Sequence, residues 1–102
     1  MKLFIVTCLK EYQEDVTKIF KDANIHVSSA TDIIGFKDNQ LPNLLEEWFA
    51  AGDEKFDSMM LFSFTANENA EKGLELIKIY NEQSQADFPI RGFIVPVEKS
   101  SY

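Results

Sequence analysis

Residues 2–9 read Lys-Leu-Phe-Ile-Val-Thr-Cys-Leu, and this dense run of β-favouring side chains predicts a strand at the start of the chain. Residues 11–23 follow it and carry one apolar stripe at helical spacing, formed by Tyr12, Val16, Ile19, Phe20 and Ala23. Asn24 stands where a left-handed residue often ends a helix. A strand followed by an amphipathic helix is therefore predicted to open the chain.

The remainder of the chain repeats this alternation. Residues 25–34 and 58–65 predict two further strands, residues 66–83 a second long helix, and residues 91–97 a fourth strand. The resulting order is β-α-β-β-α-β. It predicts a single α+β domain over residues 1–102, a ferredoxin-like sandwich with a four-stranded antiparallel sheet and two helices on one face.

Three local features refine the second half of this prediction. Thr65 and Glu68 have the spacing of a capping box at the start of the second long helix. Its predicted buried face is formed by Ala70, Gly73, Leu74, Ile77 and Asn81. Pro96 indicates that the fourth strand lies at an edge of the sheet or ends there, because proline cannot donate a ladder hydrogen bond.

Residues 36–57 are the least regular part of the chain, and a short helix is predicted within them at 42–51. Its apolar edge consists of Leu44, Leu45, Trp48 and Phe49. One interpretation is that this helix packs on its own oligomer. The other is that it anchors a partner protein, because Trp and Phe are typical binding hot spots. Glu46 and Glu47 argue against direct insertion into a membrane.

Composition excludes several classes of protein. The net charge of −7 opposes binding to the phosphate backbone of nucleic acids, so we expect no nucleic-acid partner. No run of about 18 apolar residues is present to span a membrane. The apolar start is too short for a signal peptide, and we expect a cytoplasmic protein. Cys8 is the only cysteine, which excludes an intrachain disulfide.

The strands are apolar on both faces, although two helices can cover only one of them. In the first strand Leu3 and Ile5 oppose Phe4 and Val6, and the third and fourth strands show the same pattern. Monomers rarely expose an apolar sheet of several hundred Å². We therefore expect the second face to be buried against further copies of the chain, or against residues 41–51 folding back.

Candidate catalytic and metal-binding residues are few. Cys8 and His26 could form a nucleophile pair, but a structural cysteine and a surface or interface histidine are the simpler interpretation, and we expect no enzyme. Cys8, His26, Met59 and Met60 could also recruit a soft metal ion across subunits. No CxxC or HxxxH spacing supports such a site, and the methionine pair is more typical of a core.

With these elements placed, the sequence resembles the PII signalling proteins over nearly its whole length. Residues 14–25 resemble the family's first helix, with an acidic pair followed by Val16 and an ending Ala23-Asn24-Ile25 where the family has Ala-Gly-Ile. Gly35-Phe36 resembles the family's Gly-Phe, which follows the first helix at the same spacing after Ile25. Residues 93–98, Phe-Ile-Val-Pro-Val-Glu, are similar to its closing strand.

This resemblance implies a homotrimer whose loop 36–57 docks on a partner protein such as a membrane transporter. It also implies a ligand site between subunits, where family members bind adenine nucleotides. We expect that site near Ser29, Gly35, Phe36, Lys37, Arg91 and Gly92. The related CutA family shares the trimeric fold and has been linked to metal tolerance, so a metal-binding trimer using Cys8, His26 or the methionine pair is the alternative.

The sequence departs from the family at the phosphate-binding positions. Asp38 and Asn39 stand where the family tends to place a basic residue and a glutamine, and the glycine-rich, lysine-ending loop is replaced by residues 84–92. Phosphate binding needs cations and backbone amides. The loop also lacks the family's modifiable tyrosine, since no tyrosine occurs between residues 13 and 79. The resemblance therefore leaves the identity of the ligand open, with an adenine nucleotide as one candidate.

Overall fold

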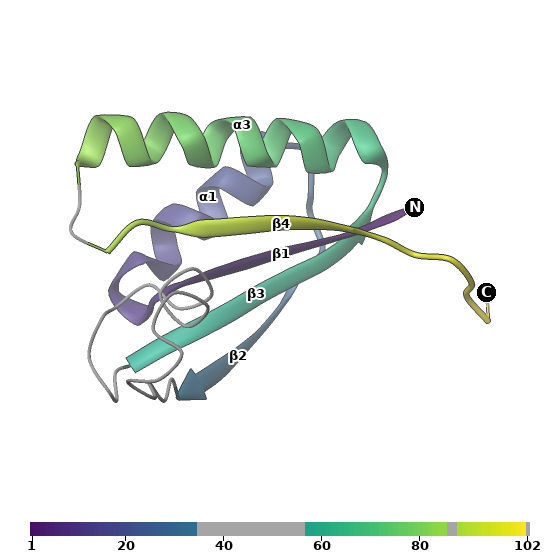
Figure 1. Ribbon diagram of the computed structural model, residues 1–102, viewed down its shortest axis with the longest axis horizontal. Coiled ribbons are helices and arrows are strands. Elements are labelled where there is room, and N and C mark those ends of the chain that lie inside the picture. The colour runs from purple at the N-terminus through teal and green to yellow at the C-terminus, as the bar shows by residue number, and fades with distance from the viewer. Residues whose placement is uncertain (35–56, 86–87, 102) are drawn as a thin grey trace, which may run out of the picture.

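A computed structural model gives the structure of residues 1–34, 57–85 and 88–101. Its elements, in chain order, are β1 (Lys2–Leu9), the 3-10 turn η1 (Lys10–Tyr12), α1 (Gln13–Asp22), β2 (Ser29–Ile34), β3 (Asp57–Thr65), α3 (Asn67–Ser84) and β4 (Arg91–Pro96) (Figure 1). The strands form one antiparallel sheet in the order β2-β3-β1-β4. The predicted ferredoxin-like α+β fold is confirmed.

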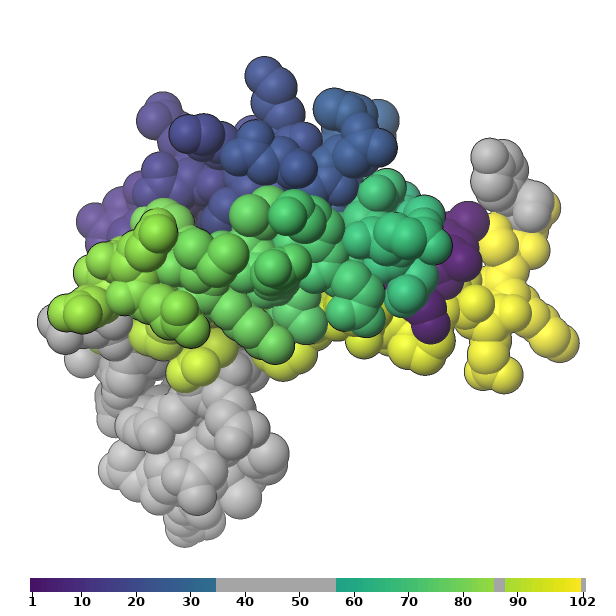
Figure 2. All heavy atoms as spheres, turned by 90° about the horizontal axis from the view of Figure 1, so that it is seen from above, coloured from purple at the N-terminus to yellow at the C-terminus, as the bar shows by residue number. Residues whose placement is uncertain are grey.

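Both helices lie on the same face of the sheet (Figure 1). α1 and α3 each contact β1 and one another, and α3 also contacts β4. In the space-filling view α3 extends along the outer surface of this layer (Figure 2). No helix in the described ranges is long and apolar enough to cross a bilayer. The opposite sheet face is left without a helix among the described residues.

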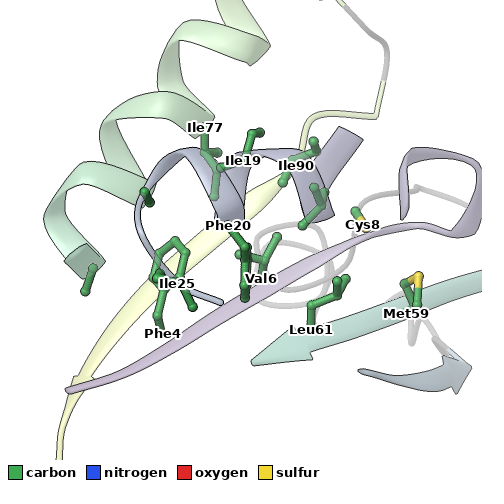
Figure 3. Packing of buried hydrophobic residues seen from close by; sticks show 13 residues of the cluster. Phe4, Val6, Cys8, Ile19, Phe20, Ile25, Met59, Leu61, Ile77 and Ile90 are labelled. Carbon is green, nitrogen blue, oxygen red and sulfur yellow. The ribbon is translucent and has the colours of Figure 1, made fainter. Parts of the chain in front are cut away.

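The core lies between the sheet and the two helices. Alternate residues of β1 point into it, and Phe4, Val6 and Cys8 are fully buried there (Figure 3). The rings of Phe4 and Phe20 meet with a centroid separation of 5.3 Å. From α3, Ala70, Gly73 and Ile77 are buried, as the predicted apolar face of that helix requires. The alternation of β1 and the stripe of each helix therefore meet in one core.

A polar contact joins the two helices outside the core. The Tyr80 hydroxyl donates a hydrogen bond of 2.6 Å to a carboxylate oxygen of Asp15. The Tyr12 and Tyr80 rings meet edge to face at 6.4 Å. Burial is the main cause, and the hydrogen bond to Asp15 the second, of the raised pKa of Tyr80, which is about 12. This contact fixes α1 against α3.

The second strand begins later than predicted, at Ser29 and not at residue 25. Asn24 adopts the expected left-handed conformation, with φ of 66°. The Ile25 amide then bonds to the Phe20 carbonyl at 2.8 Å, and the Ile25 side chain turns into the core. The chain must leave the core again before it can pair with β3, so residues 25–28 are irregular.

The predicted capping box at the second long helix is wrong. The helix begins at Asn67 with Ala66 as N-cap, and no side chain caps it. Thr65 is the last residue of β3, and its hydroxyl oxygen instead accepts a hydrogen bond of 3.0 Å from the side-chain Nδ2 of Asn69. The predicted edge position of the fourth strand is confirmed, because β4 lies at one end of the sheet and ends at Pro96.

Candidate functional site

The sheet face turned away from the helices, here called the open face, is apolar over half of its length. The strand register places two apolar rows across β3, β1 and β4, namely Phe64–Leu3–Val95 and Phe62–Ile5–Phe93. Phe64 is 58% exposed and Val95 is 38% exposed. As the alternation predicted, the sheet thus has a second apolar face, and the described part of the chain leaves it incompletely covered.

The other half of the open face mixes polar and apolar side chains. One row across it consists of Thr31, Met60, Thr7 and Arg91, and the next row consists of Ile33, Ser58 and Leu9. Within the described residues, Ser58 Oγ and Arg91 Nε are buried without a hydrogen-bond partner. Buried polar atoms usually find a partner, so these two groups distinguish this part of the open face from the apolar rows.

The predicted ligand residues of one chain do not come together. Ser29 begins β2 at one edge of the sheet, and Arg91 begins β4 at the opposite edge. Strands β3 and β1 lie between them. Gly35, Phe36 and Lys37 fall outside the described residues. A site that uses both Ser29 and Arg91 therefore requires a second chain.

Arg91 and Gly92 face opposite sides of the sheet, because neighbouring residues of a strand alternate. Arg91 is aligned with Thr7 on the open face. A Cβ atom placed on Gly92 would lie 2.8 Å from Ile77 Cδ1 and 3.3 Å from Leu74 Cδ1 of α3. Gly92 thus allows α3 to pack closely on β4, and only its backbone is left for a ligand.

Ser29 borders a hollow of about 210 Å³ at the start of β2. The hollow is lined by Val27, Ser28, Ser29, Phe62, Ser63 and Phe64. The Ser63 hydroxyl donates a hydrogen bond of 2.5 Å to the Val27 carbonyl, which fixes the entry into β2. Ser28, Phe62 and Phe64 therefore line the same hollow as Ser29.

Asn81 positions the start of β4 and is a residue that sequence reasoning did not assign to the site. Its side-chain amide donates to the Ile90 carbonyl at 2.9 Å, and its side-chain oxygen accepts from the Ile90 amide at 3.0 Å. Ile90 is 2% exposed and immediately precedes Arg91. The available signal was an amide side chain on the otherwise apolar face of the second long helix.

Replacing Asn81 with alanine is expected to lower the free energy of unfolding by about 1–3 kcal/mol, because two backbone groups of a buried residue lose their partners. The exchange rate of the Ile90 amide hydrogen should rise, since that amide bonds to Asn81. Lys78→Ala, at an exposed position of the same helix, is the control. Unchanged protection of the Ile90 amide in Asn81→Ala would contradict this role.

Of the candidate nucleophile and metal ligands, Cys8 and Met59 are cross-strand neighbours in the core, whereas His26 is exposed. Cys8 is fully buried, and burial raises the pKa of its thiol to about 11, so it is a poor nucleophile at neutral pH. Met59 is aligned with Cys8 and is 4% exposed on the same inner face. His26 is exposed, and its Nε2 lies 2.8 Å from Asn24 Oδ1. Among the described residues, no three His, Cys, Asp or Glu side chains converge.

Comparison with known proteins shows a likeness of fold and no match of sequence. Neither the protein-family models nor the curated proteins include a match. Among solved structures, the chain is similar to one described as a PII-like signalling protein of Thermus thermophilus. The TM-score is 0.63 over 91% of this chain and 82% of that chain, with 10% sequence identity. The chain has a PII-like fold. Identity this low shows the fold alone.

Most of the predicted interaction loop lies outside the described residues of this PII-like fold. Its residues 36–56, with Leu44, Leu45, Trp48 and Phe49, lie outside the described residues, as does the predicted helix at 42–51. Asp57, at the end of the loop, is exposed and begins β3. β2 ends at Ile34 opposite Asp57, so the loop leaves and rejoins the sheet at the same end of the β2–β3 pair.

Proposed function

We propose that this chain is a PII-like regulatory protein and not an enzyme. It acts in the cytoplasm as a homotrimer and docks residues 36–57 on a partner protein such as a membrane transporter, under the control of a small ligand. The observation that carries the proposal is the open apolar face on a PII-like fold.

The open face supports association of copies through their sheets. Burial of apolar surface contributes roughly 25 cal/mol per Å², or about 1.5–3 kcal/mol for a fully buried large apolar side chain. Phe64 and Val95 are substantially exposed in one chain, and Phe62 and Phe93 are half-buried. Contact between the open faces of several copies would remove these side chains from water.

The positions of Ser29 and Arg91 support a ligand site shared between subunits. They lie at opposite edges of one sheet, so only the β2 edge of one copy and the β4 edge of another bring them together. Ser29 offers a hydroxyl beside the aromatic wall of the 210 Å³ hollow, and Arg91 offers a cation. An aromatic ring joined to an anionic group, as in an adenine nucleotide, matches this chemistry.

Light scattering coupled to size-exclusion chromatography tests the trimer. The expected mass is about 35 kDa, three times the 11.7 kDa of one chain. A mass of one chain at tens of micromolar protein would overturn the proposal.

A second test changes Trp48 and Phe49 of the predicted loop both to alanine. This variant is expected to keep the trimeric mass in light scattering and the midpoint in thermal unfolding. Loss of stability in that variant would favour packing of the loop on its own trimer.

A further inference from the structure

Val27 has the most exposed large apolar side chain in the described part of the protein, at 81%. It belongs to residues 25–28, which the sequence predicts as part of a strand but which are irregular in one chain. Val27 lines the same hollow as Phe62 and Phe64 of the open face, and Phe64 is itself largely exposed. The two exposed side chains therefore belong to one apolar surface at the entry into β2, of the kind that association covers.

The backbone of Val27 is held by its own sheet on one side only. The Ser63 hydroxyl donates a hydrogen bond to the Val27 carbonyl, so that carbonyl points toward β3. In the described residues no strand lies beyond β2, and none lies beyond β4 at the other edge of the sheet (Figure 1). An open strand edge is a template for pairing with another chain. The outer side of residues 26–29 is therefore suited to an added strand.

The two edges of the sheet can pair with one another in an assembly of identical copies. Three antiparallel pairings lead from β2 to β4, so these two strands run in opposite directions. Rotation about an axis along the strands preserves those directions, and the β2 edge of one copy then meets the β4 edge of the next as an antiparallel pair. A contact between two different surfaces of this kind can close into a ring. Residues 91–95 can contribute the added strand, whereas Pro96 cannot donate a ladder hydrogen bond.

We propose that residues 26–29 of one copy extend β2 by pairing antiparallel with residues 91–94 of a second copy. The register is the one that sets Ser29 opposite Arg91 of the partner subunit, as the proposed shared ligand site requires. It sets Val27 opposite Phe93 of the partner subunit, and pairs of β-branched and aromatic side chains stabilise antiparallel sheets. The inference rests on the homotrimer of the proposed function and specifies which segments of its copies pair.

Oxidative cross-linking of the full-length variant Val27→Cys/Phe93→Cys tests this pairing. Because the Val27 carbonyl points to β3, the pair is a non-hydrogen-bonded one, with Cα atoms about 4.5 Å apart. This separation lies within the disulfide range of roughly 4.4–6.8 Å. Each chain carries both new cysteines, so a closed ring should give a covalent trimer of about 35 kDa, three times 11.7 kDa, on a non-reducing gel. The native Cys8 is fully buried in the core.

The matched control is Val27→Cys/Ile94→Cys. Ile94 packs against the core, on the opposite side of the sheet from Phe93, so this pair should not form a disulfide between copies. Three results would overturn the inference: no covalent product from Val27→Cys/Phe93→Cys, a covalent dimer as its end product, or equal cross-linking of the control.

A second measurement needs no disulfide. Val27→Asp should raise the protein concentration at half-dissociation on the order of tenfold or more, because the pairing would bury an uncompensated charge. The side chain is exposed in one chain, so the variant should fold, and Val27→Ile should behave as wild type. Wild-type association of Val27→Asp would contradict the pairing. A wild-type chain that is monomeric refutes the proposed function as well, whereas a trimeric wild type with uncross-linked cysteines refutes this inference alone.

Discussion

Replacing Phe64 with aspartate is expected to dissociate the proposed trimer into single chains. Phe64 lies on the open face and is 58% exposed in one chain, so the variant chain should still fold. An unpaired charge buried between copies costs about 3–5 kcal/mol. The protein concentration at half-dissociation should therefore rise on the order of 100-fold or more for each interface that buries the residue.

The matched control is Ile79→Asp on α3. Ile79 is a large apolar residue with 40% exposure, but it lies on the helical layer and not on the open face. It should keep the wild-type mass in light scattering or sedimentation velocity. If Phe64→Asp retains that mass at low micromolar concentration, or if both variants dissociate equally, the open face is not the surface through which the copies associate.

The elements of the fold could be predicted because their patterns are local. The alternation of β1 and the stripes of the two long helices depend only on which residues must be buried, and the structure buries Phe4, Val16 and Ile77 accordingly. The observed ends of the strands and helices differ from the predicted ones where a tertiary contact determines them. Ile25 turns into the core and delays β2, and Thr65 stays in β3 and cannot cap the next helix.

The candidate site was predictable only in part, because a site depends on which strands are neighbours. Ser29 and Arg91 are both near strand starts, but only the strand order reveals that they stand at opposite edges of the sheet. The bridge from Asn81 to Ile90 depends on how the chain returns from α3 to β4. Gly92 was predicted to lie at the ligand site, whereas its position shows close packing against α3.

Gly73 of α3 faces the Phe4 ring of β1 with no room for a side chain. A Cβ atom on Gly73 would lie 2.7 Å from Phe4 Cε2 and 2.8 Å from Phe4 Cζ. The Phe4 ring is fully buried and packs on Phe20, so it cannot move aside without disturbing the core. Gly73→Val adds three carbon atoms at this point and should destabilise the fold by about 2–3 kcal/mol through overpacking.

Thermal unfolding of Gly73→Val should show a midpoint lowered by roughly 8–24 °C, given about 4–8 °C per kcal/mol for a chain of this size. Lys72→Val, at the adjacent exposed position, places the same residue in the same helix without the clash. Adding Phe4→Leu to Gly73→Ala should restore part of the stability lost in Gly73→Ala, because the smaller side chain vacates the contact. A Gly73→Val midpoint equal to that of Lys72→Val would show that the helix can move away from Phe4, and that close packing at Gly73 does not limit the position of α3.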